Sequence, residues 1–584
     1  MKALQYLNKY FVKYKWNLLG GIIITVLSKL LALKIPTVIR NSLNAVEDYL
    51  SGATTNLKLV KTELLYDILL IIGFALVAGF FTFLMRQTII VMSRLIEFDL
   101  KNEIYKQYQR LSLNFYKKNR TGDLMNRISE DVSKVRMYFG PAIMYALSMI
   151  ISFVIGFTQM YNIAPKLAIY TMLPFPMLSV SIFILSKQIN KKSTLVQQYL
   201  SKLTTYSQEF FSGIRIVKSY AIESYVTANF DKLSDVSKHK NIALYKIQAL
   251  FFPLMILLIG LSNIFVLYIG GQQYIAGQIK IGVVAEFLLY VNILTWPVTA
   301  LGWVSSMVQQ AEASQQRINE FLEQVPKIKN TAKNPTYIKG KVEFKNVSVT
   351  YEDTGITALK NISFKLNKGK TLAVLGKIGS GKSTLLNLIC RLYDTTAGQV
   401  LIDDIDLKKC HLYNIRSQIG FVPQTPFLFS DSIENNIKFG KHKATWQEIT
   451  QAAKTAAIHN NIIEFKEGYK TVLGERGVTL SGGQKQRISI ARAIINNPKI
   501  LMFDDCLSAV DTETEEKILY NLEKLSKNKT TFIASHRVSS VKNADLIIVL
   551  ENGKIIQQGS HNQLVSEKGY YRDLCNKQLL EKEI

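Results

Sequence analysis

The sequence predicts a chain in two parts: an α-helical membrane domain of six transmembrane helices with long cytoplasmic extensions, followed by an α/β P-loop domain with a helical subdomain. Long apolar runs are concentrated in the first half of the 584 residues. In the second half, strand-like runs alternate with glycine-rich loops and amphipathic helices, which is typical of a soluble α/β domain. A chain of this length also exceeds one ordinary domain. We therefore expect the membrane domain at 1–325, a linker at 326–338 and the α/β domain at 339–584.

Six segments are long and apolar enough to cross a bilayer, which requires roughly 20 residues of helix each. They lie at about 17–39, 64–92, 138–160, 164–186, 249–275 and 281–306. Only residues 161–163 join the third segment to the fourth, so these two must form an antiparallel hairpin. Trp296-Pro297 lies in the sixth segment and predicts a kink there.

Two connections between these segments, 93–137 and 187–248, are long and charged but contain no proline or turn cluster. Their composition is helical, so we expect them to extend the membrane helices into the cytoplasm. Their basic excess places the extensions and both termini inside, at the plasma (inner) membrane of a multi-pass protein. The first 17 residues, MKALQYLNKYFVKYKWN, are basic and aromatic without a cleavable signal pattern, and predict an amphipathic helix at the membrane surface.

The net charge of +27 does not indicate nucleic-acid binding, because the Lys and Arg residues are spread among membrane-length segments. All four cysteines, Cys390, Cys410, Cys506 and Cys575, lie in the second half without metal-type pairing. This pattern fits a reduced cytosolic domain rather than a disulfide framework.

Four charged residues fall within the membrane segments. Asp67 and Glu286 lie near predicted ends, where water is close, whereas Lys29 and Lys34 lie deeper in the first segment. A charge in lipid is costly and is by default a functional hypothesis. Snorkelling to the interface, or a position facing a water-filled cavity, explains such residues equally well. Lys34 and Glu286 are therefore named only as candidate cavity groups.

The run TLAVLGKIGSGKSTLLNLI contains a phosphate-binding loop between an apolar strand and an apolar-periodic helix. Its glycines let backbone amides turn towards phosphate, and the helix N-terminus adds the positive end of its dipole. Lys382 is expected to reach the β- and γ-phosphates, and the Ser383 hydroxyl to ligate Mg²⁺. The expected nucleotide contacts of this loop are Gly376, Gly379, Ser380, Gly381, Lys382, Ser383 and Thr384.

Two later stretches complete the phosphate chemistry. The apolar strand that starts at Ile500 ends in Asp504, where such sites place a magnesium-binding acid. In LSGGQKQRISIARAI, Ser481, Gly482 and Gly483 open a helix, which makes a second anion-binding helix end. Both ends can act on one nucleotide only if another copy of the domain supplies one of them, so this chemistry predicts a dimer.

The phosphate-binding loop, LSGGQ at 480–484 and the strand ending in Asp504 together resemble the nucleotide-binding domain of an ABC transporter. Six spans before one such domain resemble a half-transporter of the exporter type, and the resemblance covers nearly the whole chain. It implies ATP and Mg²⁺ as cofactors. It also implies that 112–132 and 209–223 are coupling segments, in which short helices dock on nucleotide-binding domains.

The resemblance gives roles to further residues. Tyr351 should stack on adenine, and Gln424 in GFVPQTPFLF should sense Mg²⁺ and contact the membrane domain. Glu475 in GERG should lie near the coupling interface. Asp511 in LSAVD should cross the dimer contact, and His536 in ASHR should touch the γ-phosphate. The signature helix is expected to contact nucleotide through Ser481, Gly482, Gly483 and Gln484.

The residue after the magnesium acid departs from the family pattern. That position typically holds Glu, acting as general base or as positioner of the attacking water, whereas this chain has Asp505. Removing one methylene draws the carboxylate back, and a misplacement of about 1 Å can cost about a hundredfold in rate. With Gln424 and His536 as its catalytic neighbours, Asp505 predicts a site that binds ATP but hydrolyses it slowly.

An intact LSGGQ beside a slow site predicts an unequal pair. This chain would complete the active site of a different half-transporter that has Glu after its magnesium Asp. That arrangement resembles bacterial heterodimeric multidrug exporters, and DDCLSAVD with WPVTALGW (296–303) fits that group. The alternative is a homodimer in which Asp serves as the base, since Asp can act as a general base.

The expected function is ATP-driven export of a hydrophobic or amphipathic cargo, drug-like or lipid-like, across the bilayer. Three alternatives remain: a homodimeric lipid flippase, a peptide exporter with an N-terminal protease, and an ATP-regulated channel or sensor. The second is disfavoured, because only about 16 residues precede the first span. The cargo itself is not readable, since lipid-facing and cavity-facing positions use the same residue types.

Overall fold

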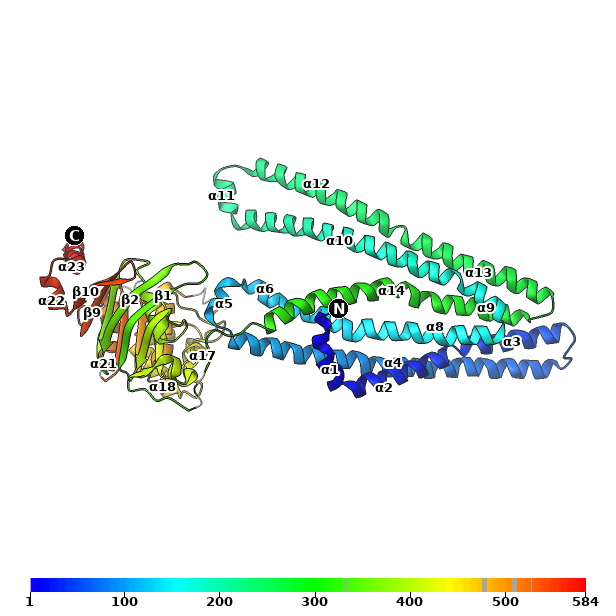
Figure 1. Ribbon diagram of the computed structural model, residues 1–584, viewed down its shortest axis with the longest axis horizontal. Helices are drawn as coiled ribbons and strands as arrows, with labels where there is room; N and C mark the ends of the chain where they lie inside the picture. The colour runs from blue at the N-terminus through cyan, green and yellow to red at the C-terminus, as the bar shows by residue number, and fades with distance from the viewer. Residues whose placement is uncertain are drawn as a thin grey trace. The chain divides into compact units, whose positions relative to one another are not determined.

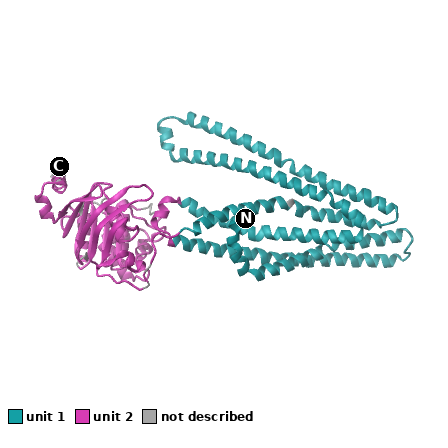
Figure 2. Ribbon diagram, viewed as in Figure 1, with its two compact units in different colours: residues 1–109, 121–324 teal, residues 110–120, 325–584 magenta. Residues whose placement is uncertain are grey.

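The computed structural model describes residues 2–330, 332, 334–474, 480–506, 512–526 and 528–583. It divides into two compact units (Figure 2). Unit 1 comprises 1–109 and 121–324, and unit 2 comprises 110–120 and 325–584. The short segment 110–120 therefore packs with the second unit, although the chain on both sides of it belongs to the first.

Unit 1 is a bundle of long helices (Figure 1). Its elements are η1 (Ala3–Leu7), α1 (Asn8–Lys13), α2 (Lys15–Ala32), α3 (Ile35–Leu50), α4 (Leu57–Arg110), α6 (Thr121–Asn126), η2 (Arg127–Asp131), α7 (Val132–Met137), η3 (Tyr138–Ala142), α8 (Ile143–Ile163), α9 (Pro165–Met172), α10 (Pro174–Ser212), α11 (Ile214–Ser219), α12 (Glu223–Gln248), α13 (Phe251–Ile275) and α14 (Ile281–Leu322).

The prediction of six membrane spans is confirmed. Among the described residues, six helical stretches are long and apolar enough to cross a membrane: 15–50, 57–110, 121–163, 165–212, 223–275 and 281–322. They exceed the predicted segments because the charged connections continue the membrane helices, as expected. Only Ala164 separates α8 from α9, as the predicted hairpin requires.

The first span, rather than the sixth, is interrupted. Pro297 lies inside α14, which continues without a break, whereas α2 ends at Ala32 and α3 begins at Ile35. Pro36 lacks the N–H that a regular helix needs at this point. The Leu33 carbonyl accepts a hydrogen bond from the Tyr290 hydroxyl of α14 at 3.0 Å. A side chain of another helix thus provides the hydrogen bond that this backbone carbonyl needs at the break.

The N-terminal segment, predicted as an amphipathic helix at the membrane surface, forms η1 and α1. Leu4, Leu7 and Tyr10 are buried within unit 1, whereas Val12 is 69% exposed. The Lys9 ammonium and the Tyr10 hydroxyl both donate to the Glu103 carboxylate of α4 at 2.8 Å. The basic and aromatic residues therefore tie the N-terminus to the extension of α4.

Unit 2 contains two sheets. Its strands are β1 (Val342–Thr350), β2 (Thr357–Leu366), β3 (Thr371–Gly376), β4 (Ala397–Ile402), β5 (Ile405–Asp406), β6 (Ile419–Val422), β7 (Ile500–Asp504), β8 (Thr530–Ser535), β9 (Leu546–Glu551) and β10 (Lys554–Gly559). The described strands form an antiparallel sheet ordered β2-β1-β4-β5 and a larger sheet ordered β10-β9-β3-β8-β7-β6. All neighbours in the larger sheet are parallel except β10 and β9.

The helices of unit 2 are α5 (Leu113–Lys118), α15 (Lys382–Ile389), η4 (Leu407–Lys409), α16 (Leu412–Arg416), α17 (Ile433–Lys438), α18 (Trp446–Thr455), α19 (His459–Glu464), η5 (Gly468–Lys470), α20 (Gly482–Ile494), α21 (Thr512–Ser526), α22 (His561–Ser566) and α23 (Tyr570–Glu583). One core joins α15 to both sheets, and a second joins α17–α20 to β6 and β7. The second core builds the predicted helical subdomain against one side of the larger sheet (Figure 1).

Candidate nucleotide-binding site

The order of the parallel sheet gathers four predicted segments at one edge. The phosphate-binding loop follows β3, Asp505 follows β7, His536 follows β8, and Gln424 lies two residues after β6. These strands are consecutive in the order β3-β8-β7-β6, and parallel strands end at the same edge of a sheet. Ligands of open α/β sheets bind outside this carboxyl edge. Topology alone therefore brings the four segments together.

The phosphate-binding loop has a backbone that only glycine adopts easily. Gly379 and Gly381 have φ angles of +83° and +104°. A Cβ on Gly381 would lie 2.6 Å from the Ala358 carbonyl oxygen, so a side chain there would be both strained and obstructed. The Lys382 ammonium lies over the loop and donates to the Gly376 carbonyl at 2.7 Å and to the Lys377 carbonyl at 3.0 Å.

Charge at the loop is balanced by two adjacent carboxylates. Burial lowers the pKa of Lys382, and the nearby Asp505 and Asp504 partly oppose this. Burial raises the pKa of Asp504, a hydrogen bond with Ser383 opposes this, and the Asp505 charge adds to it. The Ser383 hydroxyl and the Asp504 carboxylate thus meet beside the lysine; with Gln424 they are the three residues predicted to bind Mg²⁺.

The three predicted catalytic side chains meet in one hydrogen-bonded group. His536 Nδ1 lies 2.9 Å from Asp505 Oδ1 and 3.1 Å from Oδ2. Gln424 Nε2 donates to Asp505 Oδ2 at 3.4 Å. The Asp505 side chain is 14% exposed and that of His536 is 49% exposed. The Asp505 carboxylate is therefore held back at the sheet edge, with the imidazole between it and solvent.

The backbone of Asp505 is itself unusual. Its φ angle is +45°, in the left-handed region, and its N–H donates to the Ala534 carbonyl at 2.8 Å. Asp and Asn tolerate this conformation better than longer side chains do. A short side chain at position 505 thus also suits the left-handed backbone with which the chain leaves β7, a feature that no sequence motif indicated.

Tyr351, the expected adenine platform, is fixed by neighbours from two segments. Its hydroxyl lies 2.8 Å from Thr384 Oγ1, which ties it to the start of α15. The Tyr393 ring stands edge-on to the Tyr351 ring, with the centroids 5.3 Å apart. The Lys117 ammonium of α5 lies 4.8 Å from the Tyr351 centroid and 5.1 Å from that of Tyr393.

Lys117 was predicted only as part of a coupling segment, and Tyr393 was not predicted at all. Burial lowers the pKa of Lys117, but the nearby phenols of Tyr393 and Tyr351 and the Asp353 carboxylate outweigh it, so that pKa is raised. The ammonium is therefore a stable cation over both rings. No sequence motif marks this contact, because it joins residues more than 200 positions apart.

The LSGGQ segment begins α20 as predicted. The Ser481 hydroxyl accepts from the Gln484 N–H at 3.3 Å, while Gln484 Oε1 accepts from the Ser481 N–H at 3.0 Å. This capping box uses the side chains of both residues to satisfy the first turn. The amides of Gly482 and Gly483 lie in that same turn. The predicted residues Asp511 and Glu475 lie outside the described residues.

Comparison with known proteins identifies the family. Residues 18–298 match the model of the ABC transporter transmembrane region, and residues 359–508 match that of the ABC transporter. The chain is 34% identical over 585 residues to "Multidrug resistance-like ATP-binding protein MdlA" of Escherichia coli, covering all of this chain and 97% of that protein. The chain belongs to the ABC transporter family.

Two further comparisons agree with this family assignment and with the fold. It is 37% identical over 488 residues to "ATP-dependent lipid A-core flippase" of Syntrophus aciditrophicus, covering 83% of this chain and 81% of that protein. Its fold matches "Structure of a bacterial Atm1-family ABC exporter with ATP bound" with a TM-score of 0.81 and 24% identity, covering 96% of this chain and 99% of the other. The protein is a multi-pass membrane ATPase that binds ATP through its ABC domain and couples hydrolysis to transport.

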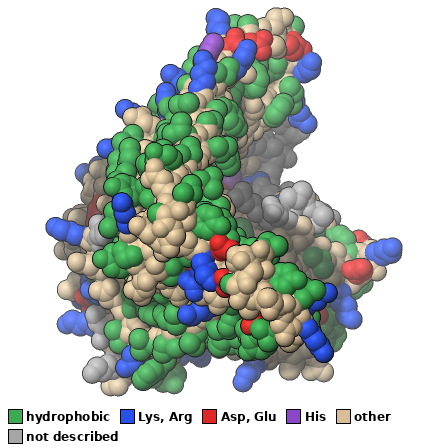
Figure 3. Space-filling model, turned by 90° about the vertical axis from the view of Figure 1, so that its right-hand side faces the viewer, with side chains coloured by type: hydrophobic (Ala, Val, Ile, Leu, Met, Phe, Trp, Pro, Cys, Tyr) green, Lys and Arg blue, Asp and Glu red, His purple; other side chains and the backbone are tan. Residues whose placement is uncertain are grey.

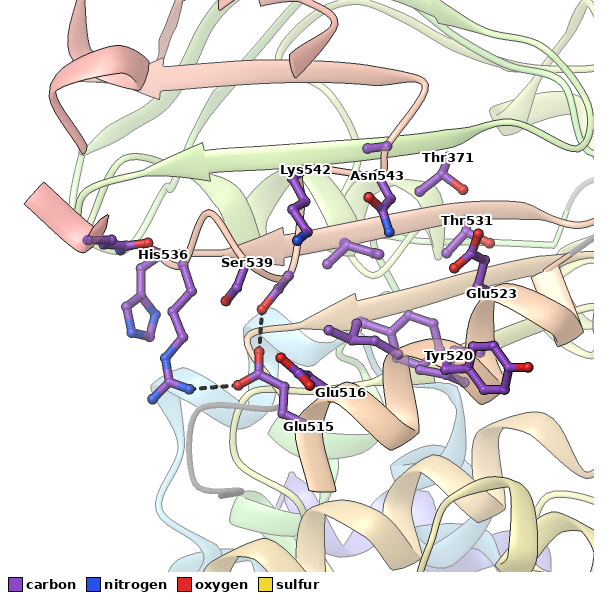
Figure 4. Close-up of a pocket in the computed structure, with 18 residues that line it drawn as sticks. Thr371, Glu515, Glu516, Tyr520, Glu523, Thr531, His536, Ser539, Lys542 and Asn543 are labelled. Carbon is purple, nitrogen blue, oxygen red and sulfur yellow. Dashed lines mark hydrogen bonds and ion pairs between the residues drawn. The ribbon is translucent and has the colours of Figure 1, made fainter. Parts of the chain in front are cut away.

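A separate cavity of about 780 Å³ lies behind His536 in the ABC transporter's unit 2 (Figure 4). Its lining comes from α21, the strands beside it and the segment 536–544, rather than from the phosphate-binding loop. The Glu515 carboxylate accepts from Arg537 at 2.7 Å and from the Ser540 hydroxyl at 2.6 Å. His536 thus lies between this cavity and the Asp505 group.

Proposed function

We propose that this chain is one half of a heterodimeric ABC exporter that expels hydrophobic or amphipathic cargo across the plasma membrane. Its partner would be a half-transporter with Glu after the magnesium Asp. The single observation that carries the proposal is the Asp505 group. The rest of the hydrolytic site is present, but its one carboxylate in the base position is short and bonded to His536. Hydrolysis would then fall mainly to the partner's site.

The nucleotide site suits Mg²⁺·ATP. Hydroxyl and carboxylate oxygens are ligands that Mg²⁺ prefers, usually with only one or two carboxylates and with phosphates and water completing the shell. Ser383 and Asp504 supply such oxygens side by side. When bound, Mg²⁺ would neutralise charge on the β- and γ-phosphates.

The distance between the Asp505 carboxylate and the attacking water should limit the rate of hydrolysis at this site. A general base acts from about 2.6–3.2 Å, directly or through one water. Asp places its carboxylate one methylene behind Glu, and a shift of about 1 Å can cost about a hundredfold in rate. With Lys382, Ser383 and Tyr351 all in place, ATP binding is retained while the chemical step is slow. The intact LSGGQ would serve the partner's ATP.

The coupling segments support pairing with a second chain. In the first, α5 packs within unit 2, where Lys117 reaches Tyr351. In the second, the tip around α11 exposes Phe211, Ile216 and Tyr220. Exposed aromatic and aliphatic side chains grouped at a helix tip favour a protein contact. We assign that contact to the nucleotide-binding domain of the partner, with unit 2 and both termini in the cytoplasm.

The cargo class follows from the relatives. One is named as multidrug resistance-like and another as a lipid A-core flippase, and both names concern amphipathic or hydrophobic molecules. We therefore propose drug-like or lipid-like cargo. A homodimeric lipid flippase is the alternative that the second of these relatives favours.

The test compares this chain alone with the chain co-purified with a candidate half-transporter that has the Glu. Both samples are reconstituted in vesicles, and phosphate release and ATP-dependent export of a hydrophobic fluorescent dye are measured. We expect the pair to hydrolyse ATP at least about tenfold faster than the chain alone, from the rate cost of a displaced base. Replacing the partner's Glu by Gln should return the pair to the slow rate.

Full hydrolysis and export by the chain alone would contradict the heterodimer and favour a homodimer. ATP-gated passive conductance without uphill transport would identify a channel or sensor instead. Translocation of a labelled phospholipid but not of the dye would identify a flippase.

A further inference from the structure

A cavity of about 490 Å³ opens in unit 1 between the broken first span and α8. Its polar lining includes Lys34, Thr37, Arg40, Gln159 and Asn162. Both ionisable side chains in the lining are cations. Irregular backbone at membrane depth is tolerated where it borders a cavity, and broken helices often mark the binding site of a transporter. The break at Leu33 lies beside this cavity.

The cavity lies close to one end of the bundle. Gln159 is four residues before the end of α8, and Glu286 is five residues after the start of α14. At 1.5 Å per residue, these positions are roughly 6–8 Å from the helix ends, near the acyl–headgroup boundary of one leaflet. The α3–α4, α8–α9 and α13–α14 connections gather at this end (Figure 1). Seen end-on, its surface is largely hydrophobic and uncharged, with acidic and basic side chains close together near the middle (Figure 3).

One of the two cations is already neutralised. Arg40 Nη1 lies 3.0 Å from Glu286 Oε2, and the Glu286 side chain is 0% exposed. The Thr37 hydroxyl donates to Glu286 Oε1 at 2.8 Å. The Tyr290 hydroxyl lies 2.8 Å from Gln159 Oε1 and 3.1 Å from Glu286 Oε1. This network fixes Arg40, Thr37 and Gln159 at the cavity wall, so the polar surface is built before any ligand arrives.

The other cation, Lys34, is exposed in the cavity, and no carboxylate of the described residues lies within ion-pair distance of its ammonium. Near the headgroup boundary the Lys34 ammonium keeps contact with water and is available to a ligand. An anion in the cavity would pair with this ammonium and would also accept a hydrogen bond from the Asn162 side chain. Leu30 and Val154 extend the wall with apolar surface.

We propose that this cavity binds the headgroup of an anionic amphiphile, a phosphate or carboxylate, with its hydrocarbon chain against Leu30 and Val154. A cationic amphiphile would meet the Lys34 ammonium and be repelled, and a zwitterion would gain only part of the attraction. The assignment rests on the proposed export function, because it names the cargo class that function would carry. The anion can belong to exported cargo or to a resident lipid of the leaflet.

The test is photolabelling of the full chain in phosphatidylcholine nanodiscs. The probe is a dodecyl phosphate with a photoreactive group on its chain, and dodecylphosphocholine with the same group is the comparison. Cross-linked peptides are mapped by mass spectrometry. We expect dodecyl phosphate to label peptides containing residues 30–37 and 154–163. Lys34→Gln should reduce that labelling about tenfold, as the loss of a charge-assisted hydrogen bond predicts, while Lys34→Arg retains it.

The matched control is Lys29→Gln, because Lys29 lies in the same span but does not line the cavity. Equal labelling by the two probes, or labelling that is unchanged in Lys34→Gln, would overturn the proposal. If Lys34→Gln is not monodisperse, unlabelled dodecyl phosphate is instead tested as a competitor of the probe on the unmodified chain. Absence of competition would overturn the proposal.

Two further arms separate the sources of the anion. Labelling that falls when Mg²⁺·ATP is added indicates cargo that moves, and labelling that stays constant indicates a resident lipid. Competition by inorganic phosphate alone would show that the headgroup suffices. Because labelling needs neither hydrolysis nor export, its failure is distinguishable from failure of the transport assay.

Discussion

Two carboxylates, one in each unit, show how differently a functional group can be held. Asp505 lies at the edge of a parallel sheet, where its partners His536 and Gln424 come from the ends of neighbouring strands. Glu286 lies inside a helix bundle and is bound by Arg40 and Thr37 of the broken first span. The first group remains partly open to solvent, whereas the second is fully buried.

The two carboxylates should therefore differ in what their substitution changes: the rate of ATP hydrolysis or the stability of the fold. At the sheet edge, strand order places the side chains and their burial is incomplete, so substitutions there should change rates more than stability. In the bundle, removing one member of the ion pair leaves a buried charge without compensation, so substitutions should change stability first.

Glu286→Gln should destabilise the membrane unit by about 1–3 kcal/mol, because the Arg40 guanidinium at the cavity wall, which is 21% exposed, loses the carboxylate that neutralises it. Thermal unfolding in detergent measures the change. The matched control is Asp48→Asn, which breaks the exposed ion pair of Asp48 with Lys280 at the end of the same helix. That pair should contribute about 0–1 kcal/mol. Equal losses of stability in the two variants would mean that burial does not determine how much each ion pair contributes to the free energy of unfolding.

Lys382→Met should lower ATP hydrolysis by the purified chain alone about a hundredfold or more, because Lys382 serves this chain's own site and a charge-stabilising donor is lost. Phosphate release under saturating Mg²⁺·ATP is the measurement, and the melting temperature should stay close to that of the unmodified chain. Lys377→Met is the control, since Lys377 is an exposed lysine in the same loop that pairs with Glu551 at 3.6 Å. A comparable loss in the control would contradict the assignment of Lys382.

Lys117→Met should weaken ATP binding only a few-fold, because a partly exposed cation–π contact is worth about 0.5–1 kcal/mol. Its larger expected effect is on coupling: ATP hydrolysis should respond less to cargo. The measurement is a titration of a fluorescent ATP analogue together with dye-stimulated hydrolysis. Lys118→Met is the neighbouring control. Unchanged affinity and unchanged stimulation would show that the contact of Lys117 with Tyr351 carries no signal.

The sequence predicted the nucleotide site better than the membrane cavity for a physical reason. The phosphate-binding loop, LSGGQ and the acid after β7 are local motifs whose spacing encodes their chemistry. The roles of Gln424 and His536 were implied by the family resemblance, and in the structure the shared edge of β3, β8, β7 and β6 brings both residues to Asp505.

The contacts in unit 1 have no such local signal. Arg40 fell one residue beyond the predicted first span, and its pairing with Glu286 joins residues 246 positions apart through helix packing. Pro297, predicted to kink the sixth span, lies within a continuous α14, whereas the first span is interrupted beside Pro36. The contact of Lys117 with Tyr351 likewise depends on where α5 docks. Pairings of this kind are set by tertiary packing and are not encoded in spacing along the chain.

The central claim is that the length of the Asp505 side chain limits hydrolysis at this chain's own site. The direct measurement is single-turnover phosphate release by the purified full chain and by its Asp505→Glu variant, at saturating Mg²⁺·ATP, with the melting temperature as a check on the left-handed backbone at this position. The account predicts that Asp505→Glu raises the rate by about tenfold to a hundredfold. A rate that is unchanged or lower, in a variant of equal stability, would contradict it.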